Sequence, residues 1–282
     1  MYKLNTKYWL EKFGSFLMDG IDSKRFLNGI TTSNIISIDT DIKKTCWLTP
    51  SGNLRALLEI HSYINDSNKF LILVLIGNVG EFRNYCNSLI FPSDEVSVSE
   101  VFDSYRLQEI HATSSWRDYK PSLLSEEQQE IYSKKNELNL LNPDDLRDWK
   151  ISQSIPNLNK EVDGKNNPLE LGLSDLIDFN KGCYLGQETM AKLKNVSSLK
   201  QEIRVWSSQK KSRNIQLNDK KVFINDKNEK VAGFITSFLE LKDHSFKGLV
   251  MIKRKYLKKY STLYSDELGP LKINKSNGSI FL

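Results

Sequence analysis

Hydrophobic and polar positions in the first half of the chain follow patterns that predict strands and helices. Residues 45–49 and 54–64 alternate on either side of a proline–glycine turn, which predicts a hairpin. The uninterrupted apolar run 70–76 predicts a buried strand, and apolar positions within 79–90 recur at helical spacing. A capped helix is predicted over 22–29, so strands and helices alternate and an α+β architecture is expected.

Weaker patterns complete the expected elements of this half. Residues 105–112 are expected to form a strand, whereas 10–18 is too mixed to support an element. A helix beginning near Asn142 is expected to stop at the Ile155–Pro156 step, because proline disfavours helical backbone in the residue before it. Residues 157–168 are polar and are expected to form an exposed, partly mobile loop.

The last third of the chain follows a different pattern. Short alternating segments are separated by polar turns, at residues 201–207, 221–224, 231–238 and 248–251. Short strands with this spacing predict an antiparallel β domain or a small barrel. We therefore expect a core domain over 1–200 and a C-terminal barrel domain over 201–282, as the length of 282 residues suggests.

Composition narrows the class of protein. Hydrophobic residues make up 39% of the chain, but the longest apolar run is far below the roughly 18 residues that a membrane span needs. The N-terminus lacks an apolar signal core, so we expect a cytoplasmic protein that does not associate with membranes. The cysteines Cys46, Cys86 and Cys183 are widely separated, which predicts neither a disulfide framework nor a self-contained metal site. A bound cluster would need ligands from a partner.

The charge of the chain is unevenly distributed. Residues 1–189 carry 20 Lys/Arg and 27 Asp/Glu, whereas 190–282 carry 20 and 8. A basic last third indicates an anionic partner or ligand, such as a folate polyglutamate tail, RNA or an acidic protein surface; the alternative is a solvated, lysine-rich surface. The densest basic run, 253–259, lacks the interleaved aromatics of a single-strand platform, so stable nucleic-acid binding is not expected.

The segment Asn180–Glu188 contains the strongest candidate chemistry. It follows residues 173–179, which alternate well enough to be a short strand, and precedes 189–193, which can begin a helix. Cys183 is therefore expected on a loop, between glycines that allow tight turning and close approach by a ligand. Lys181 and the nearby helix N-terminus would favour its thiolate. The alternative is an inert, buried cysteine at a strand-to-helix turn.

Residues 181–188, which read Lys-Gly-Cys-Tyr-Leu-Gly-Gln-Glu, resemble the K-G-C-Y-x-G-Q-E signature of the YgfZ-type folate-binding proteins. These proteins are relatives of the glycine cleavage system T-protein, an aminomethyltransferase. Residues 22–31 are similar to the N-terminal D-A-x-x-F-L-x-G-x-x-T segment of the family, and 47–53 to its L-x-P-x-G-K turn. Residues 233–237 are similar to its G-x-x-T-S strand, so the resemblance covers most of the chain.

The resemblance implies a cloverleaf of two interleaved α+β domains plus a small C-terminal antiparallel β-barrel, around an opening that holds tetrahydrofolate. Residues 167–173 resemble the P-x-E-x-G-L stretch of the T-protein, whose glutamate contacts the pterin ring. A carboxylate can accept hydrogen bonds from a ring N–H and the exocyclic amino group together, which makes Glu170 the candidate for pterin recognition. An exposed loop glutamate is the alternative.

The resemblance also implies a function. The YgfZ-type proteins have the cysteine motif and lack the assigned catalytic aspartate of the T-protein, which argues against ordinary aminomethyl transfer. We expect a tetrahydrofolate-binding helper for the assembly or repair of iron–sulfur enzymes, including those that modify tRNA. Cys183, aided by Lys181, would react with or pass on a sulfur, iron or one-carbon species.

The remaining motif residues are assigned to the structure of the loop. The glycines would shape it, the tyrosine would pack with a polar tip, and the last two residues would satisfy loop amides or cap the helix. These residues are Gly182, Tyr184, Gly186, Gln187 and Glu188.

Two alternatives stay open, and the sequence does not decide whether the protein is an enzyme. A folate-dependent aminomethyl or methyl transferase would need an acid or base near the reactive folate nitrogens, and the sequence pattern identifies no aspartate for that role. A non-catalytic scaffold would instead dock a partner through the basic barrel.

Overall fold

The computed structural model describes residues 6–37, 42–63, 66–110, 115–118, 120–135, 139–194, 199–210, 217 and 220–276. The chain forms two compact units. The first comprises Met1–Asn142 and Leu176–Met190, and the second comprises Pro143–Asp175 and Ala191–Leu282. The sequence pattern predicts a core domain over 1–200 and a barrel domain over 201–282. That division differs from these two compact units and stays a prediction.

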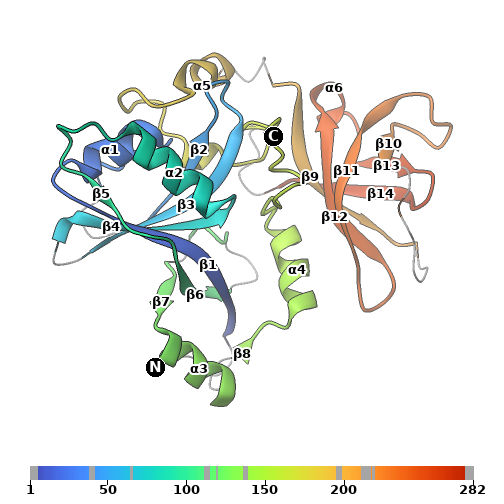
Figure 1. Ribbon diagram of the computed structural model, residues 1–282. Coiled ribbons are helices and arrows are strands. Elements are labelled where there is room, and N and C mark those ends of the chain that lie inside the picture. The colour runs from blue at the N-terminus through green and yellow to red at the C-terminus, as the bar shows by residue number, and fades with distance from the viewer. Residues whose placement is uncertain are drawn as a thin grey trace. The chain divides into compact units, whose positions relative to one another are not determined.

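The first unit is built on a sheet of eight strands within its described residues. The strands are β1 (Lys7–Asp19), β2 (Ile42–Leu48), β3 (Leu54–Tyr63), β4 (Asp66–Ile76), β5 (Ser97–Val98), β6 (Phe102–Ile110), β7 (Ser122–Leu124) and β8 (Asn139–Leu140). Six of them lie side by side in the order β2–β3–β4–β1–β6–β7, as Figure 1 shows, and β5 and β8 also pair with β1. β8 is parallel to β1, and the other pairs are antiparallel.

Strand β1 lies at the centre of this sheet. Along most of its length it pairs with β6, from Lys7 opposite Ile110 to Ser15 opposite Phe102. Its last part also pairs with β4, beginning where Ser15 lies opposite Leu73. The sequence pattern did not predict this strand, because polar and apolar side chains occur on both of its faces.

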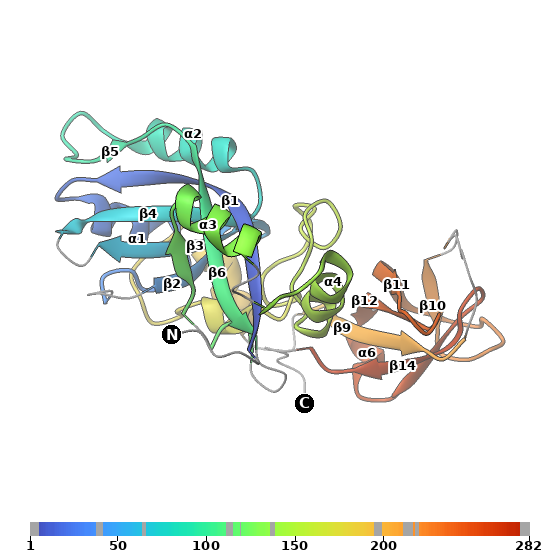
Figure 2. The same cartoon turned by 90° about the horizontal axis from the view of Figure 1, so that it is seen from below.

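One face of the sheet packs against two helices through an apolar core. These helices are α1 (Ser23–Ile30) and α2 (Val79–Leu89), and Figure 2 shows α2 lying along one side of the strands. α1 contributes Leu27 and Ile30, and α2 contributes Phe82 and Cys86. The sheet contributes residues of β1, β2, β3 and β4: Phe16, Met18, Trp47, Ala56, Leu58, Ile60, Phe70, Ile72 and Val74. Cys86 is therefore a core residue.

The opposite face of the sheet carries a buried network of charged and polar groups. On β3, Leu58 and Ile60 enter the apolar core, so Glu59 between them points to the other face. The Glu59 carboxylate accepts hydrogen bonds from Arg106 Nε at 3.0 Å and Nη2 at 2.9 Å, and Nε2 of His61 lies 2.8 Å from it. The pairing compensates for the burial of both charges, neither of which is exposed to solvent.

Electrostatics fixes the protonation state of Glu59. Burial raises the pKa of this carboxyl, but the charge of Arg106 and the hydrogen bonds from His61 and Arg106 outweigh burial and lower it from 4.5 to about 2. Because the pKa of this carboxyl is lower in the folded state than in the unfolded state, its ionisation stabilises the fold at pH values above the unfolded pKa of 4.5. This stabilisation is lost as the pH falls from 4.5 through 2.

The second unit contains a closed six-stranded barrel within its described residues, in the order β10–β11–β12–β9–β14–β13 (Figure 1). Its strands are β9 (Gln201–Ser208), β10 (Lys221–Phe223), β11 (Val231–Glu240), β12 (Phe246–Lys253), β13 (Thr262–Ser265) and β14 (Gly269–Asn274). The barrel core is apolar and includes Trp206, Ile235, Phe246, Val250 and Leu271. The sequence pattern predicted the first four strands and missed β13 and β14.

The remaining described elements are helical. They are α3 (Glu126–Lys135), α4 (Pro143–Ser152), a 3₁₀ turn at Ser174–Leu176, α5 (Gln187–Lys194) and α6 (Arg254–Leu257). α4 confirms the predicted helix that ends before the Ile155–Pro156 step. The 3₁₀ turn shows that the strand expected over 173–179 is wrong. Leu173, Leu176 and Ile177 are all buried, so close packing on several sides replaces the alternation that a half-buried strand requires.

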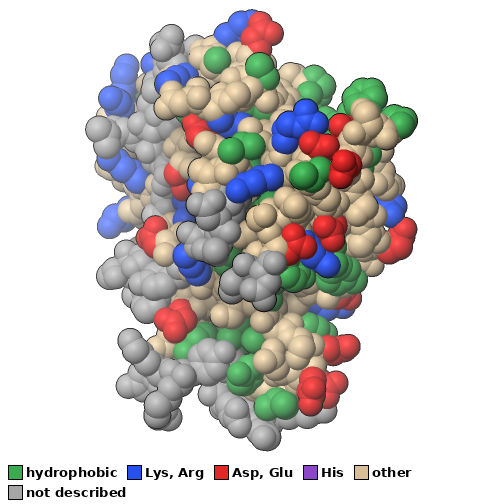
Figure 3. Space-filling view, turned by 90° about the vertical axis from the view of Figure 1, so that its left-hand side faces the viewer, with side chains coloured by type: hydrophobic (Ala, Val, Ile, Leu, Met, Phe, Trp, Pro, Cys, Tyr) green, Lys and Arg blue, Asp and Glu red, His purple; other side chains and the backbone are tan. Residues whose placement is uncertain are grey.

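The surface mixes charges of both signs. On the face in Figure 3, basic and acidic side chains are interspersed with scattered hydrophobic ones. In the basic run 253–259, Lys255, Lys258 and Lys259 are exposed, whereas Lys253 donates to the carbonyl oxygen of Val231 at 3.1 Å. In the part of the chain that the structure describes, no helix is both long and apolar enough to cross a bilayer.

Replacing Glu59 by Gln tests the buried network. The free-energy difference between wild type and Glu59→Gln should shrink by about 2 kcal/mol between pH 6 and pH 3, because Glu59 binds a proton in the unfolded wild-type chain in this window and stays ionised in the folded one. Urea unfolding at each pH measures it. Glu100→Gln, at a side chain that is 88% exposed, is the control and should show no such change. A pH-independent difference would contradict the assignment.

Candidate functional site

The motif loop, residues 176–190, belongs to the first unit and packs against the end of α1 and the turn between β2 and β3. Leu176 and Asp178 attach its beginning. The carbonyl oxygen of Leu176 accepts hydrogen bonds from Thr32 Oγ1 at 2.7 Å and Ser33 Oγ at 2.9 Å. The N–H of Asp178 donates to the carbonyl oxygen of Thr32 at 2.9 Å. These contacts join the loop to the segment that leaves α1, residues 28–33, which we call the exit segment.

Lys181 inserts its ammonium group into the exit segment. Nζ donates to the carbonyl oxygens of Asn28, Thr31 and Ser33 at 2.6, 2.7 and 2.8 Å. Carbonyl groups at a helix C-terminus lack intrahelical donors and carry the negative end of the helix dipole, so an ammonium group satisfies both needs. Burial lowers the pKa of Lys181 to about 8, against the raising effect of Asp178.

Tyr184 is the second buried side chain of the motif. Its ring lies below the Lys181 ammonium group, with Nζ 5.0 Å from the ring centroid, which is within the range of a cation–π contact. Its hydroxyl is buried and has no hydrogen-bond partner among the residues that the structure describes. Burial raises the pKa of Tyr184 to about 12, with smaller contributions from Cys46 and Asp178. Tyr184 is thus a packing residue that stays protonated near neutral pH.

Cys183 lies between these two buried side chains and is exposed. Its neighbour Gly182 is also exposed, and a Cβ added to it would lie more than 4 Å from the atoms of every described residue outside its own chain neighbours. Cys46 and Cys86, by contrast, are buried, and burial raises the pKa of the Cys86 thiol. Among the three cysteines, Cys183 is therefore the one that a reagent or partner can reach directly.

Two glycines hold the loop against the β2–β3 turn. Gly186 has φ +82°, and a Cβ there would lie 2.9 Å from the carbonyl oxygen of Thr49 and 3.2 Å from Cα of Gly52. Gly52 has φ +80°, and a Cβ there would lie 2.9 Å from the side chains of Thr189 and Met190. Each glycine therefore permits both a left-handed backbone and a close contact with the segment that carries the other.

The last two motif residues begin α5. The N–H of Gln187 donates to the carbonyl oxygen of Tyr184 at 3.1 Å, and the N–H of Met190 donates to that of Gly186 at 3.2 Å. Glu188 is an acidic residue in the first turn, where the helix dipole favours negative charge. The capping role expected of the Gln187 and Glu188 side chains stays a prediction.

Glu170, the expected pterin contact, belongs to the second unit and is buried. Its Oε2 accepts from the N–H of Asn167 at 3.3 Å, and its own N–H donates to Asn167 Oδ1 at 3.0 Å. Burial raises the pKa of Glu170, against lowering by the N–H of Asn167 and by the charge and backbone N–H of Lys200. Two carboxylate oxygens offer about four acceptor sites, so the group keeps acceptor capacity for a ligand.

The segment before Glu170 fits the expectation of an exposed loop over 157–168 only in part: residues 158–160 and 163–165 are exposed, whereas 161, 162 and 166–168 are buried. Glu161 is fully buried, and it accepts from Ser237 Oγ at 2.8 Å and from the N–H of Asn157 at 2.8 Å. Asn166 accepts from Gln201 Nε2 at 2.9 Å. The burial of Glu161 depends on its contact with Ser237 of β11. Such a contact between distant residues cannot be predicted from the polar composition of the segment.

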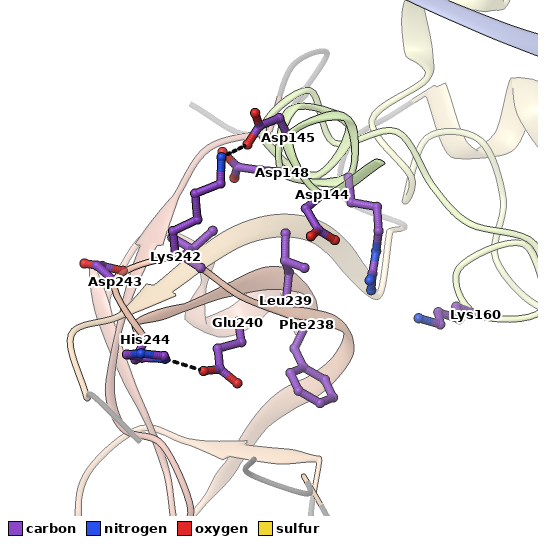
Figure 4. Close-up of a pocket in the computed structure, with 12 residues that line it drawn as sticks. Asp144, Asp145, Asp148, Lys160, Phe238, Leu239, Glu240, Lys242, Asp243 and His244 are labelled. Atoms are coloured by element: carbon purple, nitrogen blue, oxygen red, sulfur yellow. Dashed lines mark hydrogen bonds and ion pairs between the residues drawn. The ribbon is translucent and has the colours of Figure 1, made fainter. Parts of the chain in front are cut away.

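The second unit also contains a pocket of about 850 Å³ between α4 and the end of β11 (Figure 4). Charged side chains line much of it, and several pair with one another. Lys242 Nζ lies 2.8 Å from Asp145 Oδ1, and His244 Nδ1 lies 2.7 Å from Glu240 Oε1. The lining residues include neither motif-loop residues nor Glu170. These pairs account for much of the charge in the pocket without a ligand.

The site residues predicted from the sequence thus form two groups. Lys181, Cys183 and the rest of the signature lie in one loop of the first unit, and Glu170 lies in the second unit. The groups of the exit segment that hold Lys181 were not predicted, since they are backbone carbonyls about 150 residues earlier in the chain. Within the described residues, no group of three or more His, Cys, Asp and Glu is placed to hold a metal ion.

Comparison with solved structures gives the class of fold, that of the T-protein. The chain matches the crystal structure of glycine cleavage system aminomethyltransferase T from Bartonella henselae with a TM-score of 0.74. The match covers 96% of this chain and 85% of that one, at 8% sequence identity. It confirms the predicted α+β fold with a C-terminal barrel, and at this identity it shows the fold alone.

Comparison of sequences finds two relatives, and no family model matches the chain. A chloroplastic protein of Arabidopsis thaliana, named as a candidate transferase, is 43% identical over 54 residues, or 19% of this chain and 12% of that protein. An uncharacterized protein of Haemophilus influenzae is 24% identical over 207 residues, or 68% of this chain and 70% of that protein.

Adding one methyl group to Gly186 tests the contact with the β2–β3 turn. Gly186→Ala should lower the free energy of unfolding by roughly 2 to 3 kcal/mol, because the left-handed backbone and the close approach to Thr49 both oppose a Cβ. Gly182→Ala, in the same loop, is the matched control and should change stability by less than about 0.5 kcal/mol. Chemical denaturation measures both; equal effects would contradict the proposed contact.

Proposed function

We propose that this protein binds a reduced folate through Glu170 and uses the thiol of Cys183 to assist the assembly or repair of iron–sulfur enzymes, among them enzymes that modify tRNA. The observation that carries the proposal is an exposed thiol held between two buried side chains, Lys181 and Tyr184, in a protein with a T-protein-like fold. The resemblance of residues 181–188 to the YgfZ-type signature supports the same function.

Glu170 has the chemistry that a pterin ring needs. A buried carboxylate can accept two N–H groups that lie side by side on the ring, and the low polarity of its surroundings strengthens these hydrogen bonds. The buried contacts of Glu161 with Ser237 and Asn157 fix the preceding segment. A hydrogen bond from the N–H of Ile203 to the carbonyl oxygen of Glu170, at 2.8 Å, holds its backbone against β9. When bound, the folate would supply a carrier for one-carbon units.

Cys183 has the chemistry that iron needs. A thiolate is a soft ligand that suits iron in clusters, and such clusters are typically held by four thiolates. Cys183 would lose its proton to solvent and bind an iron atom of the client, while the client supplies the other ligands. This division of ligands requires Cys183 to be accessible, which its position at an exposed tip provides.

A folate-dependent aminomethyl or methyl transferase is the second candidate. Two observations favour it: the likeness to aminomethyltransferase T and the name of the Arabidopsis relative. Incubation of the protein with tetrahydrofolate and an aminomethyl donor separates the two candidates. Turnover over many cycles favours the transferase, and its absence favours the helper.

Glu170→Gln tests the folate assignment. The substitution should weaken tetrahydrofolate binding roughly 10- to 100-fold, because it removes the charge from a buried hydrogen-bond acceptor. Quenching of protein fluorescence measures the dissociation constant. Glu229→Gln, at an exposed position in the same unit, is the control and should bind like wild type. Absence of binding at millimolar folate, or equal binding by both variants, would remove the ligand assignment.

Cys183→Ser tests the thiol in cells that lack the wild-type protein. The activity of a dependent iron–sulfur enzyme that modifies tRNA should fall at least tenfold, because a hydroxyl is a poor ligand for iron. Gly182→Ala is the control, since it changes the adjacent position and keeps the thiol. Full activity with Cys183→Ser would refute the role of the thiol. If reversing the charges of Lys258 and Lys259 were then disruptive, the docking scaffold would be favoured.

A further inference from the structure

Within the motif loop, two exposed residues lie between two buried ones. Lys181 and Tyr184 are buried, whereas Gly182 and Cys183 between them are exposed. The two buried side chains contact each other through the ammonium group and the ring. The exposed pair therefore forms a short tip that is fixed at both of its ends.

The hydrogen bonds of Lys181 are fully used by this arrangement. An ammonium group has three N–H donors, and each of the carbonyl oxygens of Asn28, Thr31 and Ser33 lies within 2.8 Å of Nζ. A thiolate would have to compete with these carbonyl oxygens for an N–H group of Lys181. The geometry thus directs the positive charge toward the C-terminus of α1.

The exit segment that accepts these hydrogen bonds also holds the beginning of the motif loop. Thr32 and Ser33 donate through their hydroxyl groups to Leu176, and the carbonyl oxygen of Thr32 accepts from Asp178. Lys181 is thus the last of several attachments between the same two stretches of chain. Its loss would release the side of the tip that lies nearest to these attachments.

We propose that Lys181 is a positioning residue, which clamps the tip that carries Cys183 onto the exit segment and takes no part in activating the thiol. The inference rests on the proposed function of Cys183, and it makes that function depend on a backbone socket of three carbonyl oxygens. It replaces the expected electrostatic assistance from Lys181 with a mechanical role.

A spin label on Cys183 tests the proposal, since Cys46 and Cys86 are buried. In wild type the label should move slowly, and Lys181→Ala should shorten its rotational correlation time at least threefold. Methylammonium chloride should restore the slow motion by filling the socket, because it offers three N–H donors. Tetramethylammonium chloride, which has the same charge and no N–H group, should not. Lys192→Ala, at an exposed lysine of α5, is the matched control and should resemble wild type.

The rate of Cys183 alkylation by iodoacetamide between pH 6 and pH 10 separates positioning from electrostatic activation. A clamp leaves the midpoint of the rate–pH profile unchanged in Lys181→Ala. An upward shift of that midpoint by one pH unit or more, or a label as immobile as in wild type, overturns the proposal. Neither readout requires folate or an iron–sulfur client, so failure of the clamp and failure of the proposed function are distinguishable.

Hydrogen exchange of the wild-type protein gives a test that needs no folded variant. If Lys181 joins the two stretches, the amides of the exit segment and those of residues 178–184 should open together, with the same dependence on urea. Exchange of the loop amides at least tenfold faster than the exit-segment amides, with a different urea dependence, overturns the proposal.

Discussion

The hydrogen bonds of the exit segment are the constraint on which the rest of the site depends. This short stretch ends α1, borders the outer strand β2, and receives the motif loop. The N–H of Thr32 donates to the carbonyl oxygen of Cys46, and the N–H of Cys46 donates to Thr32 Oγ1. These bonds cover backbone groups that an edge strand would otherwise expose. The helix end, the sheet edge and the functional loop are thus completed by the same few backbone groups.

The elements that the sequence predicted are those in which one physical requirement decides the pattern. The hairpin of β2 and β3, the strand β4 and the helices α1 and α2 face one apolar core, so their hydrophobic spacing reflects one geometry. The central strand β1 was missed because it lies between an apolar core and a polar network. Phe16 enters the core, while Trp9 lies against the guanidinium group of Arg106, at 4.6 Å. Neither face is exposed enough to produce a clean alternation.

The candidate site was predictable where the cause is local and not where it is distant. Gly182 and Gly186 around Cys183 indicated a loop, and the loop is present. The direction of the Lys181 side chain depends on carbonyl groups at the end of a helix far away in the sequence, which local patterns cannot encode. Glu170 was recognised by resemblance, but its burial and its link to Ile203 follow from packing against the barrel.

The contact between Gly52 and Gly186 limits how the motif loop can be exchanged between related proteins. Because each glycine lies where a side chain on it would meet the other segment, the β2–β3 turn and the motif loop are complementary surfaces rather than independent parts. A chimera that takes the loop from one protein and the turn from another would inherit a mismatch at this point. The smallest transplantable module is therefore discontinuous: two segments more than a hundred residues apart, which must be exchanged as a pair.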